Sequence, residues 1–99
     1  MMHPADGPRF DQLDRGEYER MLELECHLRE LRTGYRRACP ELALPGEPRP
    51  EYLPGIPMMA RLAIKAAELD MAESSVRRVL KDYEDRGLLA LIDNRRLTA

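Results

Sequence analysis

The pattern of apolar and polar residues predicts an amphipathic helix in the first third of the chain. Between residues 17 and 33, four apolar side chains recur at spacings of three, four and three: Met21, Leu24, Leu28 and Leu31. These spacings put them on one face of an α-helix, with acidic residues in the first turn and basic residues in the last, as the helix dipole favours. Gly34 supplies the stop. We expect a helix over residues 17–33 whose apolar stripe packs on its own chain, with a short coiled-coil seam as the alternative.

A second pattern predicts two shorter helices joined by a sharp turn. Pro57 stands just ahead of the first of them, a favoured place for proline. That helix has apolar or small residues at spacings of four and three: Leu62, Ala66 and Leu69. The next helix has an inner face of Val76, Val79, Leu80 and Tyr83 and ends at Gly87. Because about three residues join the two helices, they must turn sharply against each other.

The stretch between these units is rich in proline. Six of the eight prolines lie between Pro40 and Pro57, and each removes a backbone donor and restricts the residue before it. Residues 34–57 are therefore expected to be an extended linker with polyproline II character, and residues 1–16 a flexible N-terminus. The predicted fold class is all-α: the N-terminal helix packs back as the third member of a homeodomain-like arrangement, and residues 58–99 form a helix-turn-helix with a basic tail.

The spacing within the helix pair matches a helix-turn-helix. This motif needs a small residue where the second helix crosses the first, here Ala66, and apolar residues three, five, ten and thirteen positions later. Those positions hold Leu69, Met71, Val76 and Val79. Two residues depart from the pattern: Asp70 replaces the usual glycine of the turn, and Lys65 replaces a commonly apolar residue. We expect Asp70 to adopt the left-handed conformation and Lys65 to extend its charge out along the surface.

If the second helix is a recognition helix, its outer face carries the candidate DNA contacts. The residues left outside are Glu73, Ser74, Ser75, Arg77, Arg78 and Lys81. Serines near a helix N-terminus can donate to phosphates or base edges, arginines can reach guanine in the major groove, and Lys81 lies a turn further toward the DNA backbone. We therefore expect Ser74, Ser75, Arg77, Arg78 and Lys81 to bind double-stranded DNA, with a solvated face kept for solubility as the alternative.

The tail from Gly87 admits two structures. In one, Leu88 and Leu91 fold back on the helix pair and leave Arg95 and Arg96 as a basic exit beside the DNA backbone. In the other, residues 89–92 and 97–99 form a short hairpin, like the wing of a winged-helix regulator. Arg95 and Arg96 join the predicted set of DNA contacts.

Composition and charge narrow the class of function. The chain has 99 residues, room for one small domain, and no apolar run approaches the roughly 18 residues that span a bilayer. The net charge is −2, yet residues 58–99 hold eight Lys/Arg against seven Asp/Glu, whereas residues 1–57 hold eight against eleven. The distribution of charge is therefore compatible with DNA binding but does not by itself indicate it. With no signal-like start, the chain is expected in the cytoplasm.

The sequence contains no side-chain set typical of catalysis or metal binding. Cys26 and Cys39 are expected to be free thiols, and His3 and His27 complete no recognisable set of zinc ligands. His27 is expected to be half-buried or at the surface, with nothing nearby to orient it. We expect no enzyme activity, no metal, no cofactor, no small-molecule substrate and no membrane partner.

Three segments of the chain, taken in order, match the motifs of a known protein family. Residues 25–34 form a helix end that closes in Thr-Gly, residues 48–52 read Pro-Arg-Pro-Glu-Tyr, and residues 75–95 hold a helix with Tyr83 in its last turn, followed by Gly-Leu-Leu-Ala-Leu-Ile-Asp-Asn-Arg. Together these segments cover roughly residues 18–96. They resemble the N-terminal helix-turn-helix region of bacterial transposases and integrases of the Mu type, which precedes a retroviral-integrase-like catalytic core.

The resemblance implies recognition of transposon ends in a bacterial cytoplasm, with the chain on the nucleoid when it is bound to DNA. A homo-oligomer on DNA stays open. The carboxylate triad of that family sits on a separate ribonuclease-H-like domain that would begin after Ala99, so we expect binding without catalysis. A truncated transposase, an excised domain and a stand-alone binder from a mobile element all remain open.

Two rival functions are kept beside this one. A winged-helix transcriptional regulator would be favoured by antiparallel strands in residues 89–99. A protein-interaction module that dimerises through the helix over residues 17–33, without touching DNA, is favoured by the acidic sequence pI of about 5.7.

Overall fold

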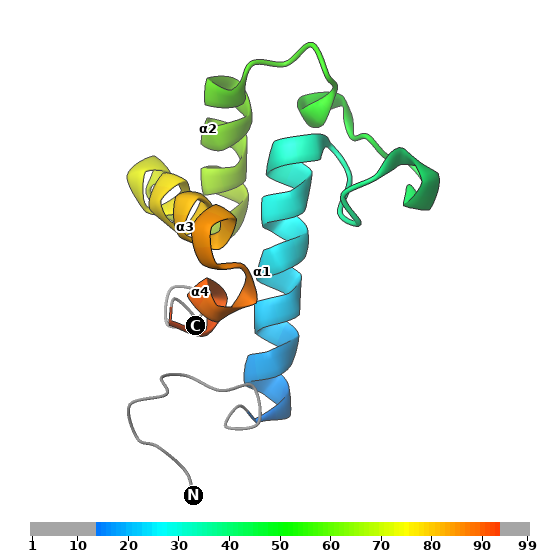
Figure 1. The fold of residues 1–99 in the computed structure, drawn as a ribbon. Helices are drawn as coiled ribbons and strands as arrows, with labels where there is room; N and C mark the ends of the chain where they lie inside the picture. The colour runs from blue at the N-terminus through cyan, green and yellow to red at the C-terminus, as the bar shows by residue number, and fades with distance from the viewer. Residues whose placement is uncertain (1–13, 94–99) are drawn as a thin grey trace, which may run out of the picture.

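The computed structural model describes residues 14–93, which fold into α-helices, short 3-10 helices and connecting turns (Figure 1). The elements are α1 (Arg15–Thr33), the 3-10 helices η3 (Pro40–Leu42) and η4 (Pro50–Tyr52), α2 (Met58–Leu69), α3 (Glu73–Arg86) and α4 (Leu88–Asp93). The all-α fold class predicted from the sequence is confirmed. The three expected α-helices are joined by a fourth, α4.

Both ends of α1 are fixed by local chemistry. The Asp14 carboxylate accepts the backbone N–H of Glu17 at 2.7 Å, and the Glu17 carboxylate accepts that of Asp14 at 3.4 Å. This capping box starts the helix two residues earlier than predicted. At the other end Gly34 has φ of 88° and donates its N–H to the carbonyl of Glu30. A Cβ on Gly34 would lie 2.8 Å from the carbonyl oxygen of Tyr52, so only glycine lets the linker approach here.

The apolar stripe of α1 forms the wall on which the other helices pack. Its four side chains are at most 3% exposed: Met21, Leu24, Leu28 and Leu31. They contribute to two clusters, one with residues of α3 and α4 (Val79, Leu91 and Ile92) and one with residues of α2 and α3 (Leu62, Ala66 and Val76). The prediction that the stripe packs on its own chain is confirmed. Because these side chains are covered, they offer no coiled-coil seam to a second molecule.

The helix-turn-helix forms as the spacing predicts. Asp70 ends α2 in the left-handed region, at φ 54° and ψ 48°. The N–H of Met71 reaches back to the carbonyl of Ala66 at 2.9 Å. Ala66 itself is 4% exposed, and Val76 and Val79 are 1% exposed. The small residue, the turn and the inner face of the second helix therefore take the predicted places.

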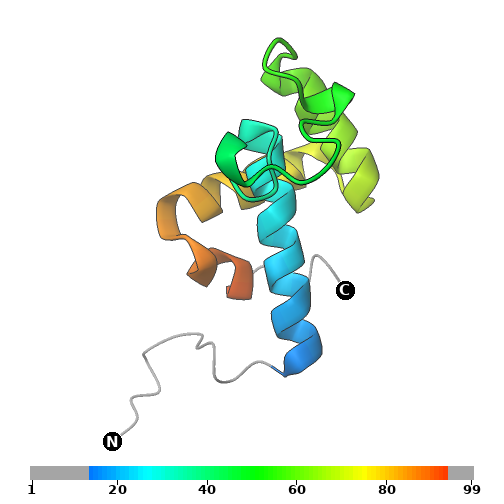
Figure 2. The same ribbon diagram turned by 90° about the vertical axis from the view of Figure 1, so that its right-hand side faces the viewer.

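The linker over residues 34–57 is not the extended segment that was predicted. Pro40 and Pro50 each occupy the start of a 3-10 helix, where the backbone N–H that proline lacks would have no partner within the helix. Tyr52 is fully buried, and η4 contacts both α1 and α2 (Figure 2). Proline density excludes long helices but excludes neither single helical turns nor burial, and for this reason the prediction of an extended linker was wrong.

The tail folds back as a helix. In α4 three consecutive residues are at most 1% exposed: Ala90, Leu91 and Ile92. A half-buried strand would alternate inward and outward side chains, whereas one helical turn set against α1 and α3 can bury three in succession. The alternative of a wing strand over residues 89–92 is therefore wrong. Residues 94–99, with Arg95 and Arg96, lie outside the described part of the chain, as do residues 1–13 of the expected flexible N-terminus.

Replacing Leu28 by Asp is expected to abolish cooperative folding of α2 and α3 together with α1. Leu28 is fully buried, and an unpaired buried carboxylate costs several kcal/mol against a total stability of about 5–15 kcal/mol. Far-UV circular dichroism during thermal unfolding would show this. Met59→Asp is the matched control because Met59 is 77% exposed, and it should melt like the unaltered protein. A cooperative transition retained by Leu28→Asp would contradict the packing described.

Candidate nucleic-acid interface

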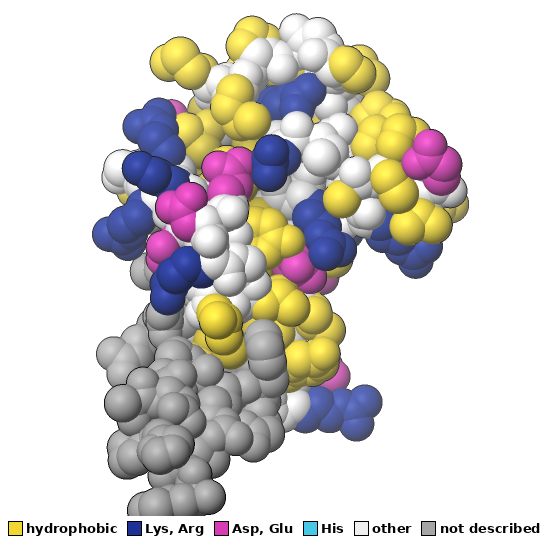
Figure 3. Space-filling view, viewed as in Figure 1, with side chains coloured by type: hydrophobic (Ala, Val, Ile, Leu, Met, Phe, Trp, Pro, Cys, Tyr) yellow, Lys and Arg dark blue, Asp and Glu magenta, His cyan; other side chains and the backbone are white. Residues whose placement is uncertain are grey.

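The outer face of α3 brings together five of the seven predicted DNA contacts. Ser74, Arg77, Arg78 and Lys81 are exposed and Ser75 is half-buried. In the space-filling view, Lys and Arg side chains gather along the edge of the molecule where α3 lies, with acidic side chains beside them (Figure 3). The other two predicted contacts, Arg95 and Arg96, lie beyond the described residues.

The cations on this face have no partner within the described part of the protein. Neither Arg77, Arg78 nor Lys81 takes part in an ion pair or a side-chain hydrogen bond with residues 14–93. Most other arginines in this part are paired with carboxylates, namely Arg15, Arg29, Arg32, Arg36, Arg49 and Arg86. A cation without an internal partner can bind a phosphate or a base edge without first breaking a bond.

Polar contacts with α1 fix the orientation of α3. The Tyr83 hydroxyl donates to the Glu25 carboxylate at 2.7 Å, and the same carboxylate accepts from Arg29 at 3.1 Å. Near the helix ends, Arg32 pairs with Glu84 at 3.0 Å. Burial raises the pKa of Tyr83, and the bond to Glu25 acts in the same direction, so the tyrosine remains a donor at neutral pH. The outer face of α3 is thus held in place by contacts on its inner side.

A charged cluster centred on the buried Lys65 joins α1, α2 and the linker. Lys65 is 0% exposed, and the prediction that its charge would extend along the surface was wrong. Its ammonium group donates to Glu30 at 2.7 Å and to Nδ1 of His27 at 3.0 Å, and it forms an ion pair with Glu68 at 3.0 Å. The three N–H groups of the ammonium are therefore surrounded by acceptors from three residues.

The linker supplies the remaining members of the Lys65 cluster. Arg49 donates to both oxygens of Glu30, at 2.8 and 2.6 Å, and pairs with Glu68 at 2.7 Å. The Tyr52 hydroxyl donates to Glu68 at 2.5 Å, and the Lys65 ammonium lies 4.8 Å from the centre of the Tyr52 ring. Two cations therefore balance two carboxylates in the Lys65 cluster, in which Lys65 and Glu30 are buried and Arg49 and Glu68 are partly exposed.

The pKa values of the two carboxylates agree with this balance. Burial alone would raise the pKa of Glu30, but the hydrogen bonds from Arg49 and Lys65 outweigh it and lower the pKa. Burial acts the same way on Glu68, and bonds from Tyr52, Lys65 and Arg49 lower its pKa to about 2. Both carboxylates are therefore ionised at neutral pH.

One group of residues in the described part has the composition of a metal site. Ligand atoms of His27, Glu30 and Glu68 lie within 4.8 Å of one another. However, Lys65 places its ammonium group against all three, at the position that a metal ion would need. The cluster is therefore built around a lysine cation, and its donors are already used.

Sequence reasoning missed this cluster and assigned His27 no orienting neighbour. The signal was present in Lys65, which stands at a commonly apolar position of the helix-turn-helix. A commonly apolar position indicates a buried side chain, but Glu30, the partner of Lys65, is 35 residues away in sequence. Neither periodicity nor motif spacing connects residues so far apart.

The half-buried His27 is held in one tautomer. Because an ammonium group can only donate, Nδ1 of His27 must accept the bond from Lys65, which places the proton on Nε2. Nε2 faces a carboxylate oxygen of Glu23 at 3.5 Å. Burial, followed by the charge of Lys65, lowers the pKa of His27 from its ordinary value of 6.5. The imidazole is therefore neutral in the folded protein at pH 7.

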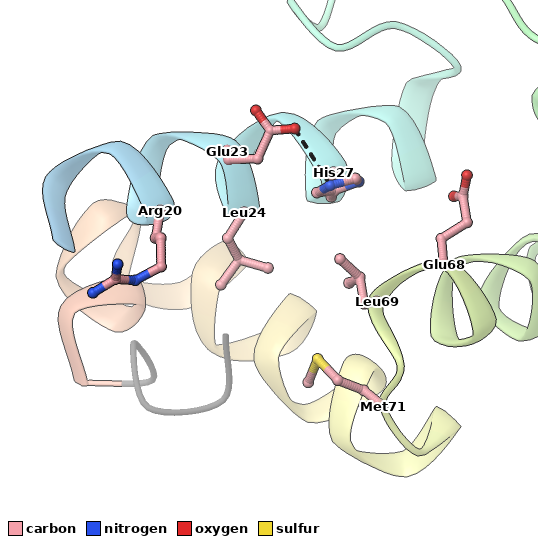
Figure 4. A pocket seen from close by; sticks show the side chains of 7 residues that line it. All are labelled: Arg20, Glu23, Leu24, His27, Glu68, Leu69 and Met71. Carbon is pink, nitrogen blue, oxygen red and sulfur yellow. Dashed lines mark ion pairs between the residues drawn. The ribbon is translucent and has the colours of Figure 1, made fainter. Parts of the chain in front are cut away.

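A small hollow lies between α1 and the turn of the helix-turn-helix (Figure 4). Leu24, Leu69 and Met71 form its apolar side, with Arg20, Glu23, His27 and Glu68 around them. Its volume is about 230 Å³, and a neighbouring polar hollow measures about 280 Å³. Both are smaller than the roughly 300–1,000 Å³ of typical small-molecule sites. The outer face of α3 is therefore the stronger candidate site.

Comparison with known proteins adds no assignment. No protein-family model, no curated protein and no solved structure matches this chain. Among the described helices, none combines the length and the apolar character needed to cross a lipid bilayer.

Replacing Lys65 by Met is expected to lower the free energy of unfolding by up to about 3–5 kcal/mol, because the carboxylates Glu30 and Glu68 would then share Arg49 as their one cation. Urea unfolding at neutral pH measures the loss. Lys81→Met removes the same charge from an exposed site and should change stability by about 0.5 kcal/mol or less. Equal stabilities of the two variants would show that the buried network contributes nothing.

Acidification is expected to destabilise the protein through His27. In the unfolded chain the imidazole takes up a proton near pH 6.5, whereas the folded protein resists this until a lower pH. Protonation therefore favours the unfolded state, and the contribution of His27 is lost as the pH falls below 6.5. Unfolding free energies measured between pH 7.5 and pH 5 for the protein and for His27→Gln should converge or cross as the pH falls. A pH-independent difference between them would refute the contribution.

Proposed function

We propose that this chain is a sequence-specific DNA-binding unit that inserts α3 into the major groove of double-stranded DNA. The observation that carries the proposal is the set of three exposed cations without internal partners on the outer face of α3, the second helix of a helix-turn-helix: Arg77, Arg78 and Lys81. A face of this kind is where helix-turn-helix proteins contact DNA.

The residues on this face suit different parts of a DNA target. Arg77 and Arg78 have the planar donor set that binds O6 and N7 of guanine, and Lys81 has a point charge suited to a phosphate. Ser74 and Ser75 lie in the first turn, whose N-cap residue, Ala72, provides no side-chain hydrogen bond. The uncapped N–H groups of that turn suit a phosphate oxygen.

The resemblance to Mu-type transposases and integrases supports the ends of a mobile element as the target. In that setting the chain would recognise terminal DNA on the bacterial nucleoid, in the cytoplasm, as a monomer or an oligomer on DNA. The proposal assigns binding alone to this chain and leaves strand chemistry to a catalytic domain of another segment or molecule.

The described residues give the two rival functions less support. The winged-helix regulator needs a strand over residues 89–92, which are helical. Dimerisation through α1 needs its apolar stripe, which the chain's own helices cover. The acidic pI remains an argument for modest affinity, because non-specific attraction to DNA depends on positive charge.

Selection from a randomised duplex library at low salt tests the proposal. The protein is expected to enrich one motif, and the Arg77→Ala/Arg78→Ala variant is expected to lose it. Each arginine that contacts a guanine should account for about 5- to 150-fold in affinity, from the 1–3 kcal/mol of a bidentate base contact.

The matched control is Arg20→Ala/Arg37→Ala. This variant has the same net charge as the test variant, and both of its altered residues are exposed and belong to other segments, Arg20 to α1 and Arg37 to the linker. It should enrich the same motif as the unaltered protein. If the protein itself enriches no motif, or if both variants lose it alike, α3 is not the reading helix and the proposal fails.

A further inference from the structure

One acidic residue stands among the cations of the proposed DNA-binding face. Glu73 is the first residue of α3, is exposed, and has no ion pair or side-chain hydrogen bond within residues 14–93. It lies one helical turn before Arg77, on the same flank of the helix. A free carboxylate at this place opposes the approach of DNA phosphates, so its presence needs an explanation beyond charge.

The spacing of Glu73 and Arg77 would allow them to neutralise each other. Two other acid–arginine pairs with the same spacing and the same order along the helix do form ion pairs: Glu25 with Arg29 at 3.1 Å and Asp82 with Arg86 at 3.0 Å. Glu73 and Arg77 form none. Both side chains are therefore available for outside partners, one as an acceptor and one as a donor.

A carboxylate presented to the major groove discriminates between bases. It can accept a hydrogen bond from the N4 amino group of cytosine, whereas guanine and thymine offer it no donor and the N6 donor of adenine stands beside the acceptor N7, which repels a carboxylate. The Cβ atoms of residues four apart on a helix are about 5–6 Å apart, and successive bases on a strand are about 3.4 Å apart. Two such side chains therefore reach bases one or two steps apart.

We infer that Glu73 is a specificity-determining residue that selects a cytosine one or two steps from the guanine bound by Arg77. The inference rests on the proposed function and deepens it, because it assigns a base preference to a second residue of α3. Glu73 also suits the positive end of the helix dipole, so a merely structural role must be separated from base reading. Base preference separates the two, because the helix dipole does not depend on the DNA sequence.

The test repeats the library selection with Glu73→Gln and with Asp85→Asn. Both substitutions remove one negative charge from an exposed position of α3, Glu73 in its first turn and Asp85 in its last. A glutamine amide binds N6 and N7 of adenine. We expect Glu73→Gln to change the selected cytosine to adenine, with a shift of about 5- to 150-fold in the ratio of affinities for the two bases.

The Asp85→Asn variant should enrich the unaltered motif, with affinity for all sequences equal or slightly higher. Thermal unfolding of both variants checks that they remain folded. If Glu73→Gln selects the same motif as the unaltered protein, the inference fails while the proposed function stands. The inference also fails if both variants change the motif in the same way. If the unaltered protein selects no motif, both the proposed function and the inference fail.

Discussion

The buried ammonium group of Lys65 is the constraint on which the arrangement of this protein depends. A buried charge is tolerated only when polar or charged partners surround it. Removing one partner of a buried ion pair destabilises a protein far more than replacing the whole pair by apolar residues. The partners of Lys65 come from α1, through Glu30 and His27, and from α2 itself, through Glu68. The linker contributes the Tyr52 ring, over which the ammonium group lies, and Arg49, which pairs with Glu30. These three segments must therefore assemble together.

The Lys65 cluster also affects the position of α3, the proposed recognition helix. With α2 fixed against α1, the left-handed Asp70 and the close contact at Ala66 set the direction in which α3 leaves the turn. Apolar contacts of Val76 and Val79 then hold the inner side of α3. On its outer side Arg77 and Arg78 are exposed and form no ion pair or side-chain hydrogen bond within the described protein, which leaves them for the proposed recognition of DNA.

The parts of the fold that follow from local sequence could be predicted, and the parts that follow from long-range contacts could not. The stripe beginning at Met21, the turn at Asp70 and the outward position of Arg77 all depend on residues within about two turns of each other. The burial of Lys65 and Tyr52 depends on partners in other segments. Helix α4 (Leu88–Asp93) is too short for its apolar residues to show a period, so the sequence allows both a strand over residues 89–92 and a packed tail.

The same separation applies to the candidate site. Which side chains of α3 face outward follows from which face is apolar, and the structure places Ser74, Arg78 and Lys81 accordingly. The sequence does not reveal that Arg78 and Lys81 lack carboxylate partners within the described residues, whereas Arg49 has two. Pairing is a property of the assembled surface, and no spacing rule along one helix contains it.

The Lys65 cluster also has a consequence for inheritance. A helix-turn-helix is often treated as a cassette that recombination can move from one protein to another. In this chain such a transfer, if it began at Pro57, would carry Lys65 and Glu68 but leave behind Glu30 on α1 and Arg49 on the linker. Evolution can therefore exchange this motif only as the whole assembly from α1 to α4, or after the lysine has first been replaced by an apolar residue.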